Sequence, residues 1–207
     1  EIYQCDWSSD VCSSDLTTTA GGSLSISHSG LLTSTSGMSL DGAFSESGSG
    51  STSIAGSITT TGDAISFGTQ VTLTGALSLN SSGGAITSSS TINGAYALNM
   101  TSGSGNVTVN GAIGGSVRVS DVTIATTGVL TLSSLTAASL TQTGPCSSFS
   151  FSTINTNTAL GISIAGGGGS FNGSITATGG GGFQLYDYGF ATFSNQGIFL
   201  EGSFLQT

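Results

Sequence analysis

The fold is most clearly indicated by residues 62–115, GDAISFGTQVTLTGALSLNSSGGAITSSSTINGAYALNMTSGSGNVTVNGAIGG. Within it, apolar and polar residues alternate in short runs such as Ile65-Ser66-Phe67, Leu77-Ser78-Leu79 and Val107-Thr108-Val109. Alternation with a period of two buries one side of a β-strand and exposes the other side. Glycine turns such as Gly83-Gly84 separate these runs, because glycine adopts the positive φ angles that tight turns need. The tract therefore predicts short β-strands joined by tight turns.

These strands recur at a longer, fixed spacing along the chain. Four apolar strand residues are spaced 21 positions apart: Leu77, Leu98, Val119 and Leu140. A constant period of this length is typical of a solenoid, in which each coil buries its inner residues only by stacking on its neighbours. We therefore predict an all-β fold, a right-handed parallel β-helix (β-solenoid) in which residues 17–207 form about nine coils of about 21 residues. The four residues are expected to point inward in successive coils, and Pro145 is expected in a turn.

The composition agrees with stacked coils and excludes several classes of function. Charged residues make up 5% of the chain, and Arg118 is its one basic residue besides a single histidine. Stacking places equivalent residues above one another, where like charges destabilise, so we expect uncharged outward ladders of Ser, Thr and Asn. Nucleic acid is excluded as a partner, because neutralising phosphates requires several cations. No apolar run is long enough for a transmembrane helix.

The first sixteen residues, EIYQCDWSSDVCSSDL, differ from the rest of the chain. They hold the only Trp, two of the three Cys and four of the ten acidic residues. The run from Asp6 to Leu16 resembles a conceptual translation of a sequencing adapter. We therefore expect residues 1–16 to be a non-native scar that packs poorly, with Trp7, Val11 and Leu16 not fully buried in the core, and residues 17–207 to be a β-helix fragment. Cys146 is then the only cysteine, so no disulfide framework is expected.

Two motifs carry a resemblance to a known family. The run Gly-Asn-Val-Thr-Val-Asn-Gly-Ala at 105–112 and the run Gly-Gly-Ala-Ile-Thr at 83–87 resemble the strand repeats of filamentous-haemagglutinin-like and autotransporter passenger proteins of Gram-negative bacteria. The resemblance covers residues 62–115 strongly and the remainder loosely. It implies a large β-helical adhesin or structural stalk that is secreted or held on the outer-membrane surface. Its implied partner is a receptor or glycan on a host or neighbouring cell.

A second class of function is a β-helical carbohydrate-active or glycan-binding protein whose active coils lie outside this fragment. Sugar hydrolysis needs two carboxyl groups at a defined separation. The acidic residues after position 16 are scattered singly along the chain: Asp41, Glu46, Asp63, Asp121, Asp187 and Glu201. We therefore expect no enzyme, and we identify no catalytic, cofactor-binding or metal-binding residue in the sequence.

Individual charged residues are expected to be structural. Arg118 and Asp121 are expected to form a surface ion pair, because they lie three residues apart near a strand end. His28 is expected to be a solvated turn or face residue. Asp41 and Asp63 are 22 residues apart, so we expect them to be exposed in the turns of neighbouring coils.

Aromatic residues gather near the C-terminal end of the sequence. The last 25 residues hold seven of them: Phe183, Tyr186, Tyr188, Phe190, Phe193, Phe199 and Phe204. The favoured interpretation is an aromatic stack inside the coils, with one or two tyrosines exposed. The alternative is a platform of Tyr186 and Tyr188 on which a glycan stacks.

Overall fold

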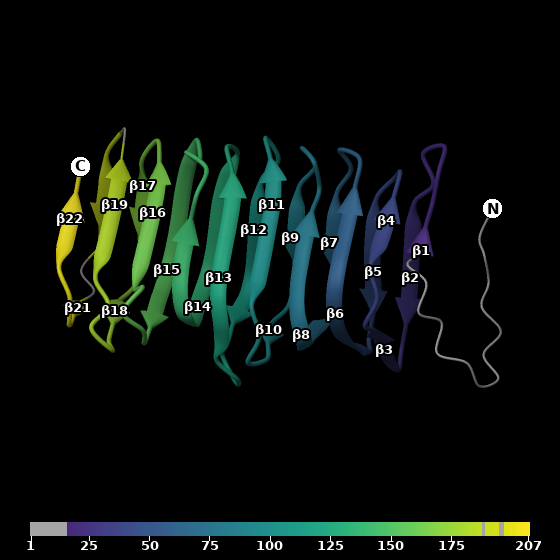
Figure 1. Cartoon of the computed structure of the whole chain (residues 1–207), viewed down its shortest axis with the longest axis horizontal. Coiled ribbons are helices and arrows are strands. Elements are labelled where there is room, and N and C mark those ends of the chain that lie inside the picture. The colour runs from purple at the N-terminus through teal and green to yellow at the C-terminus, as the bar shows by residue number, and fades with distance from the viewer. Residues whose placement is uncertain (1–15, 188, 195–196) are drawn as a thin grey trace.

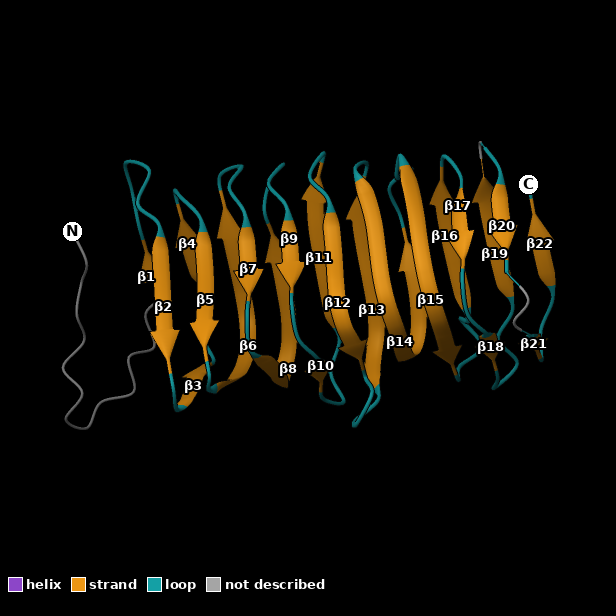
Figure 2. Ribbon diagram, turned by 180° about the vertical axis from the view of Figure 1, so that it is seen from behind, coloured by secondary structure: helices purple, strands orange, loops and turns teal. Residues whose placement is uncertain are grey.

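The computed structural model describes residues 16–187, 189–194 and 197–207 (Figure 1). All regular structure in these residues is β-strand, and they contain no helix that could span a membrane. Each strand pairs in parallel with equivalent strands of neighbouring coils, on both sides within the stack and on one side at its ends. The predicted all-β solenoid, with about nine coils that repeat about every 21 residues, is confirmed. β1 and β22 lie at opposite ends of the stack (Figures 1 and 2).

Each coil has strands at three positions, which we call faces 1, 2 and 3. Face 1 consists of β2 (Leu24–His28), β5 (Phe44–Gly48), β7 (Ile65–Phe67), β9 (Ile86–Ser88), β17 (Gly169–Phe171), β20 (Ala191–Phe193) and the first parts of β12 (Val107–Ile113), β14 (Val129–Gln142) and β15 (Ser148–Thr156). Face 2 consists of β3 (Leu31–Ser34), β10 (Ile92–Asn93), β18 (Ile175–Ala177), β21 (Ile198–Leu200), later parts of β12, β14 and β15, and the first parts of β6 (Ser51–Thr60) and β8 (Gln70–Asn80). Face 3 consists of β1 (Leu16–Thr17), β4 (Met38–Leu40), β11 (Leu98–Gly103), β13 (Val119–Thr126), β16 (Ile162–Gly166), β19 (Phe183–Asp187), β22 (Phe204–Gln206) and the last parts of β6, β8 and β14.

The spacing between paired residues is 21 at several steps along the rod and varies from 18 to 24 at the others. Leu77 pairs with Leu98, and Ile162 pairs with Phe183, as the spacing predicts. Val119 is buried as predicted, but the residue that stacks between Leu98 and Leu140 is Val122. The residue predicted to stack in this coil was therefore wrong by three positions. The turn between β12 and β13 is longer than its neighbours, and the next coil restores the register.

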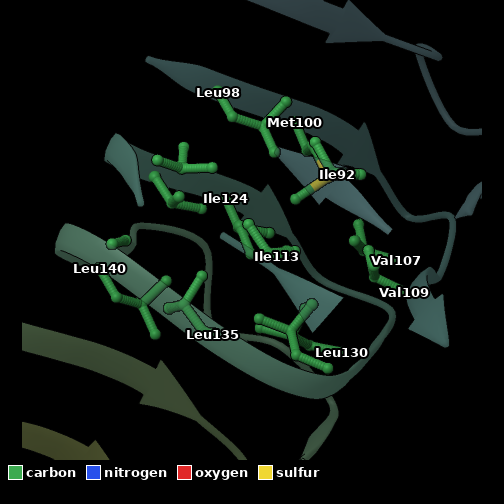
Figure 3. Close-up of a cluster of buried hydrophobic side chains, with 14 of the residues drawn as sticks. Ile92, Leu98, Met100, Val107, Val109, Ile113, Ile124, Leu130, Leu135 and Leu140 are labelled. Atoms are coloured by element: carbon green, nitrogen blue, oxygen red, sulfur yellow. The ribbon is translucent and has the colours of Figure 1, made fainter. Parts of the chain in front are cut away.

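The core is a set of inward columns that run along the rod. Figure 3 shows one stretch, where Ile92, Leu98 and Val107 from different strand positions converge on the interior. Leu98, Val107 and Ile113 are completely buried. Burying each such side chain contributes about 1.5–3 kcal/mol. Because the partners come from the coils above and below, stability depends on stacking rather than on any one coil.

Buried hydroxyls close the turns that follow face 3. Thr60, Ser81 and Ser102 lie 21 residues apart and are fully buried. Each donates a hydrogen bond to the carbonyl oxygen three residues later, over 2.6 Å to Asp63, 2.5 Å to Gly84 and 2.7 Å to Gly105. A buried hydroxyl needs such a partner. The turns also pack closely, since a Cβ on Gly105 would lie 2.0 Å from the Gly84 carbonyl oxygen. The corner therefore requires a small hydroxyl residue, and glycine follows it three residues later in two of the three coils.

Two further expectations concern local features of the chain. Pro145 lies in the turn between β14 and β15, as predicted. Leu16, the last residue of the predicted scar, begins β1, pairs with Met38 and is half-buried. Trp7 and Val11 lie outside the described residues.

Candidate functional site

An outward column of hydroxyl residues runs along face 1, and we call it the face-1 ladder. Its members pair in register from coil to coil: Ser25, Ser45, Ser66, Thr87, Thr108, Thr131, Ser150, Ser170 and Thr192. The side chains are half-buried or exposed, and none is charged. Adjacent parallel strands are about 4.8 Å apart, so the ladder presents hydroxyls at that repeat. The predicted outward ladders of Ser and Thr are therefore present.

A similar column on face 3 mixes hydroxyl and amide side chains, and we call it the face-3 ladder. It comprises Ser57, Ser78, Asn99, Thr123, Thr141, Ser163 and Gln184.

Hydrogen bonds along the rod are seen in the face-1 ladder. Ser170 donates to Ser150 over 3.4 Å, and the Asn172 amide donates to both serines. Both ladders offer donors and acceptors to a partner in repeated positions.

A charged group lies inside the core behind the face-1 ladder. Glu46 occupies the inward column between Ile26 and Phe67, and its side chain is fully buried. Its Oε1 atom accepts hydrogen bonds from His28 Nε2 over 2.5 Å and from the Thr69 hydroxyl over 2.7 Å. Its Oε2 atom accepts from the amides of Gly68 and Thr69, both over 3.1 Å. The buried carboxylate is therefore completely hydrogen-bonded.

The electrostatics of this cluster follow from its hydrogen bonds. Burial alone would raise the pKa of Glu46, but the hydrogen bonds from Thr69, His28 and Gly68 lower the pKa below its ordinary value of 4.5. The pKa of His28 is raised above 6.5, chiefly by its hydrogen bond with the Gly30 carbonyl and then by Glu46. Both ring nitrogens of His28 face acceptors, Gly30 oxygen and Glu46 Oε1. This arrangement suits the imidazolium form, which has two donors.

The expectation for His28 was therefore wrong. Its side chain is only 13% exposed and pairs with Glu46. The 21-residue alignment of Phe44-Ser45-Glu46 with Ile65-Ser66-Phe67 could have placed Glu46 inside the rod, because Phe67 is a core position. Every hydrogen-bonding site of the cluster faces another group of the chain, so the cluster suits a structural role. Within residues 16–207, apart from the gaps at 188 and 195–196, no three metal-ligating side chains gather.

Arg118 does not pair with Asp121, so the expected ion pair was also wrong. Arg118 Nη1 donates to the backbone oxygens of Ala137 over 2.6 Å and Asn155 over 3.2 Å, and Nη2 donates to Asn155 Oδ1 over 2.9 Å. The Asp121 carboxylate instead accepts from the Ser139 hydroxyl over 2.6 Å. The long turn before β13 directs Arg118 along the rod, across the next two coils. The three-residue spacing of Arg118 and Asp121 in the sequence does not reveal the direction in which the Arg118 side chain points.

Beside Arg118 there is an open recess of about 330 Å³. Its lining comes from successive coils: Ala95, Arg118, Val119, Ser120, Ala138 and Asn157. No sequence pattern indicates this recess, because its residues are distant in the chain and meet only when the coils stack.

Asp41 and Asp63 do not stack on each other. The Asp41 carboxylate accepts from the Gly21 amide over 2.7 Å and from the Thr61 hydroxyl over 3.0 Å, and these bonds lower its pKa below 3.8. Asp41 is half-buried, so its predicted exposure was wrong, whereas Asp63 is exposed as predicted. Asp63 takes part in its own turn through its backbone carbonyl, which accepts from the Thr60 hydroxyl.

The predicted inner stack of C-terminal aromatics is only partly present: Phe183 is buried and contacts other rings, whereas Phe190 and Phe199 are 94% and 57% exposed. Phe171 lies 4.9 Å from Phe193 and 5.4 Å from Phe183, measured between ring centroids. Phe183 lies 5.3 Å from Phe204. Tyr186 is 39% exposed, and its hydroxyl donates to Gln184. Tyr188, the other half of the expected glycan platform, lies outside the described residues.

Comparison of this chain with known protein families, curated proteins and solved structures finds no match. The geometry of the rod is therefore the basis for its functional interpretation.

Proposed function

We propose that this chain is a non-catalytic rod segment of a large secreted or surface-held bacterial β-helix protein, acting as an adhesin or structural stalk. The observation that carries the proposal is the face-1 ladder, an uncharged hydroxyl column that continues through all the coils. The resemblance of residues 62–115 to filamentous-haemagglutinin-like and autotransporter repeats supports the same role. The partner is a receptor or glycan on a host or neighbouring cell.

The ladder suits adhesion because its contacts repeat. One hydroxyl hydrogen bond contributes about 1 kcal/mol at most once water is displaced. A column of such groups on one rigid rod can engage a repetitive partner at several points, and linked contacts raise avidity strongly. The scarcity of charge also means that binding on this face does not depend on salt.

The test uses beads coated with the full chain and applied to epithelial and bacterial cells. One variant replaces five face-1 ladder residues by alanine: Ser45, Ser66, Thr87, Thr108 and Thr131. The matched control replaces five face-3 ladder residues by alanine: Ser57, Ser78, Asn99, Thr123 and Thr141. We expect wild-type beads to adhere, the face-1 variant to lose about tenfold in adhesion, and the control to retain it. Adhesion no better than that of uncoated beads would contradict an adhesin, and equal loss in both variants would contradict the face-1 assignment.

The carbohydrate-active alternative is tested by incubating the full chain with a panel of polysaccharides and measuring new reducing ends. We expect no release, because sugar cleavage needs two positioned ionisable groups and the Asp41 carboxylate is already engaged by Gly21 and Thr61. Reproducible release that disappears in Asp41→Ala or Asp63→Ala would overturn the non-catalytic assignment.

A further inference from the structure

A departure from the 21-residue spacing places Arg118, the only Lys or Arg of the chain, beside a recess. The turn from Gly114 to Arg118 is held by Asn93, whose Oδ1 atom accepts from the amides of Ser116 over 2.9 Å and Val117 over 3.3 Å. Asn93 itself is buried. The irregular turn is therefore anchored, and it fixes the direction in which Arg118 leaves the rod.

The Arg118 guanidinium is held by hydrogen bonds, but not all of its N–H donors take part in them. Its three hydrogen bonds engage Nη1 twice and Nη2 once, and Nε–H makes none with the described residues. A guanidinium has five N–H donors, so two remain, one on Nε and one on Nη2. A planar carboxylate can accept from two such donors together. Because these two donors are already fixed in place before a ligand binds, the entropy cost of binding is lower.

The rest of the recess complements a sugar ring. Ser120 and Asn157 contribute a hydroxyl and a carboxamide, and neither side chain has a hydrogen-bond partner among the described residues. Ala95 and Ala138 contribute small apolar surfaces against which ring C–H groups can pack, and the buried Val119 lies beneath them. A volume of about 330 Å³ is at the small end of ligand sites. One monosaccharide unit therefore suits this recess better than a larger ligand.

We propose that the Arg118 recess binds a carboxylated sugar, with the carboxylate on the Nε and Nη2 donors and ring hydroxyls on Ser120 and Asn157. This inference rests on the proposed adhesive function and names the kind of glycan recognised. The chain carries ten acidic residues and one Lys or Arg, so a polyanionic glycan is repelled at longer range. The partner is therefore a largely neutral glycan that bears isolated carboxylated units.

The experiment follows the Arg118 Nε–H signal of the ¹⁵N-labelled full chain by NMR. Arg118 is the only arginine, so this signal needs no further assignment. We expect glucuronate to shift it saturably with a dissociation constant of about 1 mM, as suits one small ligand. Glucose supplies the ring without the carboxylate, and acetate supplies the carboxylate without the ring. We expect no shift with glucose and at least about tenfold weaker binding with acetate.

Two variants complete the test without touching the Arg118 hydrogen bonds. Ser120→Asp places a carboxylate beside the guanidinium and is expected to abolish the glucuronate shift. Ser78→Asp adds the same charge on the face-3 ladder of an earlier coil and is expected to leave the shift intact. An Nε–H signal that glucuronate does not move, or moves equally in Ser120→Asp, would overturn the proposal. If glucuronate binding fails but coated beads still adhere in Ser120→Asp, the adhesive function stands and the sugar site is refuted. If glucuronate shifts the Nε–H signal but wild-type beads do not adhere, the sugar site stands and adhesion is refuted.

Discussion

One inward column of face 1 differs in chemistry between its two ends. From N-terminus to C-terminus, the column contains Ile26, Glu46, Phe67, Ser88, Val109, Leu132, Phe151, Phe171 and Phe193. Near its start a carboxylate fills the column, and near its end three phenylalanines do. Both Glu46 and Phe171 are buried. The column therefore requires that space be filled and polar atoms be paired, but not that every residue be apolar.

The two ends are stabilised by different interactions. Phe171 stacks on Phe151 at 5.6 Å and on Phe193 at 4.9 Å, with nearly parallel rings in both pairs. Such contacts add to the large apolar area that each ring buries. Glu46 instead depends on directed hydrogen bonds from His28, Gly68 and Thr69. Substitutions should therefore affect the two ends in different ways.

The largest effect is expected at the aromatic end. Phe171→Ala should lower the free energy of unfolding by about 4 kcal/mol, because it leaves a cavity between two rings. Urea unfolding followed by circular dichroism measures this change. Ser170→Ala, the outward neighbour, serves as the control and should change stability by less than about 0.5 kcal/mol. A loss at Phe171 no greater than the control would show that the aromatic stack contributes little.

A somewhat smaller loss is expected at the polar end. Glu46→Ala should cost about 3 kcal/mol, because it leaves the buried donors of His28 and Thr69 without their acceptor. Ser45→Ala is the matched outward control, and urea unfolding again provides the measurement. If Glu46→Leu proves as stable as the wild type, an apolar side chain serves equally well, and the specific need for a carboxylate at this position is refuted.

The polar end should also make stability depend on pH. The pKa of His28 is raised above 6.5, so its contribution is complete below 6.5 and is lost as pH rises through the folded-state pKa. The pKa of Glu46 is lowered below 4.5, so its contribution is complete above 4.5 and is lost as pH falls through the folded-state pKa. We therefore expect the highest thermal midpoint between pH 4.5 and 6.5.

The matched variant for this pH effect is Glu46→Gln, which keeps the size of the side chain but cannot form the ion pair. Its thermal midpoint should fall less than that of the wild type between pH 6 and pH 9. Asp41, whose pKa is also lowered, contributes to the fall of the thermal midpoint at acid pH in both proteins. An equal fall of the thermal midpoint between pH 6 and pH 9 in the two proteins would show that His28 and Glu46 are not coupled.

The smallest effect is expected between the two ends, at Ser88. This inward serine is buried and donates one hydrogen bond to the Ser90 carbonyl over 3.1 Å. Ser88→Ala should change the free energy of unfolding by less than about 1 kcal/mol, since the lost bond is offset by the loss of a buried hydroxyl. A loss as large as that of Glu46→Ala would mean that every polar atom in the column is equally important.

The corner hydroxyls and the inner aromatics show how far a sequence period can be used. Residues such as Ser81 and Phe183 lie where the 21-residue alignment places them, because parallel coils of equal length keep equivalent residues in register. Arg118 and Val122 lie where the alignment does not place them, because one longer turn shifts the register locally. A period measured between Leu77 and Leu140 spans this shift and its compensation, so it cannot reveal either one.

The alternation and the period were enough to predict a parallel β-solenoid with uncharged outward ladders, because both are local properties that stacking converts directly into structure. The buried pair of Glu46 and His28 and the recess beside Arg118 became visible in the folded rod alone. Those contacts join residues 18 and 37 positions apart, as in His28 with Glu46 and Arg118 with Asn155. Neither separation is a multiple of the period. Such contacts depend on where the turns direct side chains, and turn geometry is set by packing between coils rather than by the repeat.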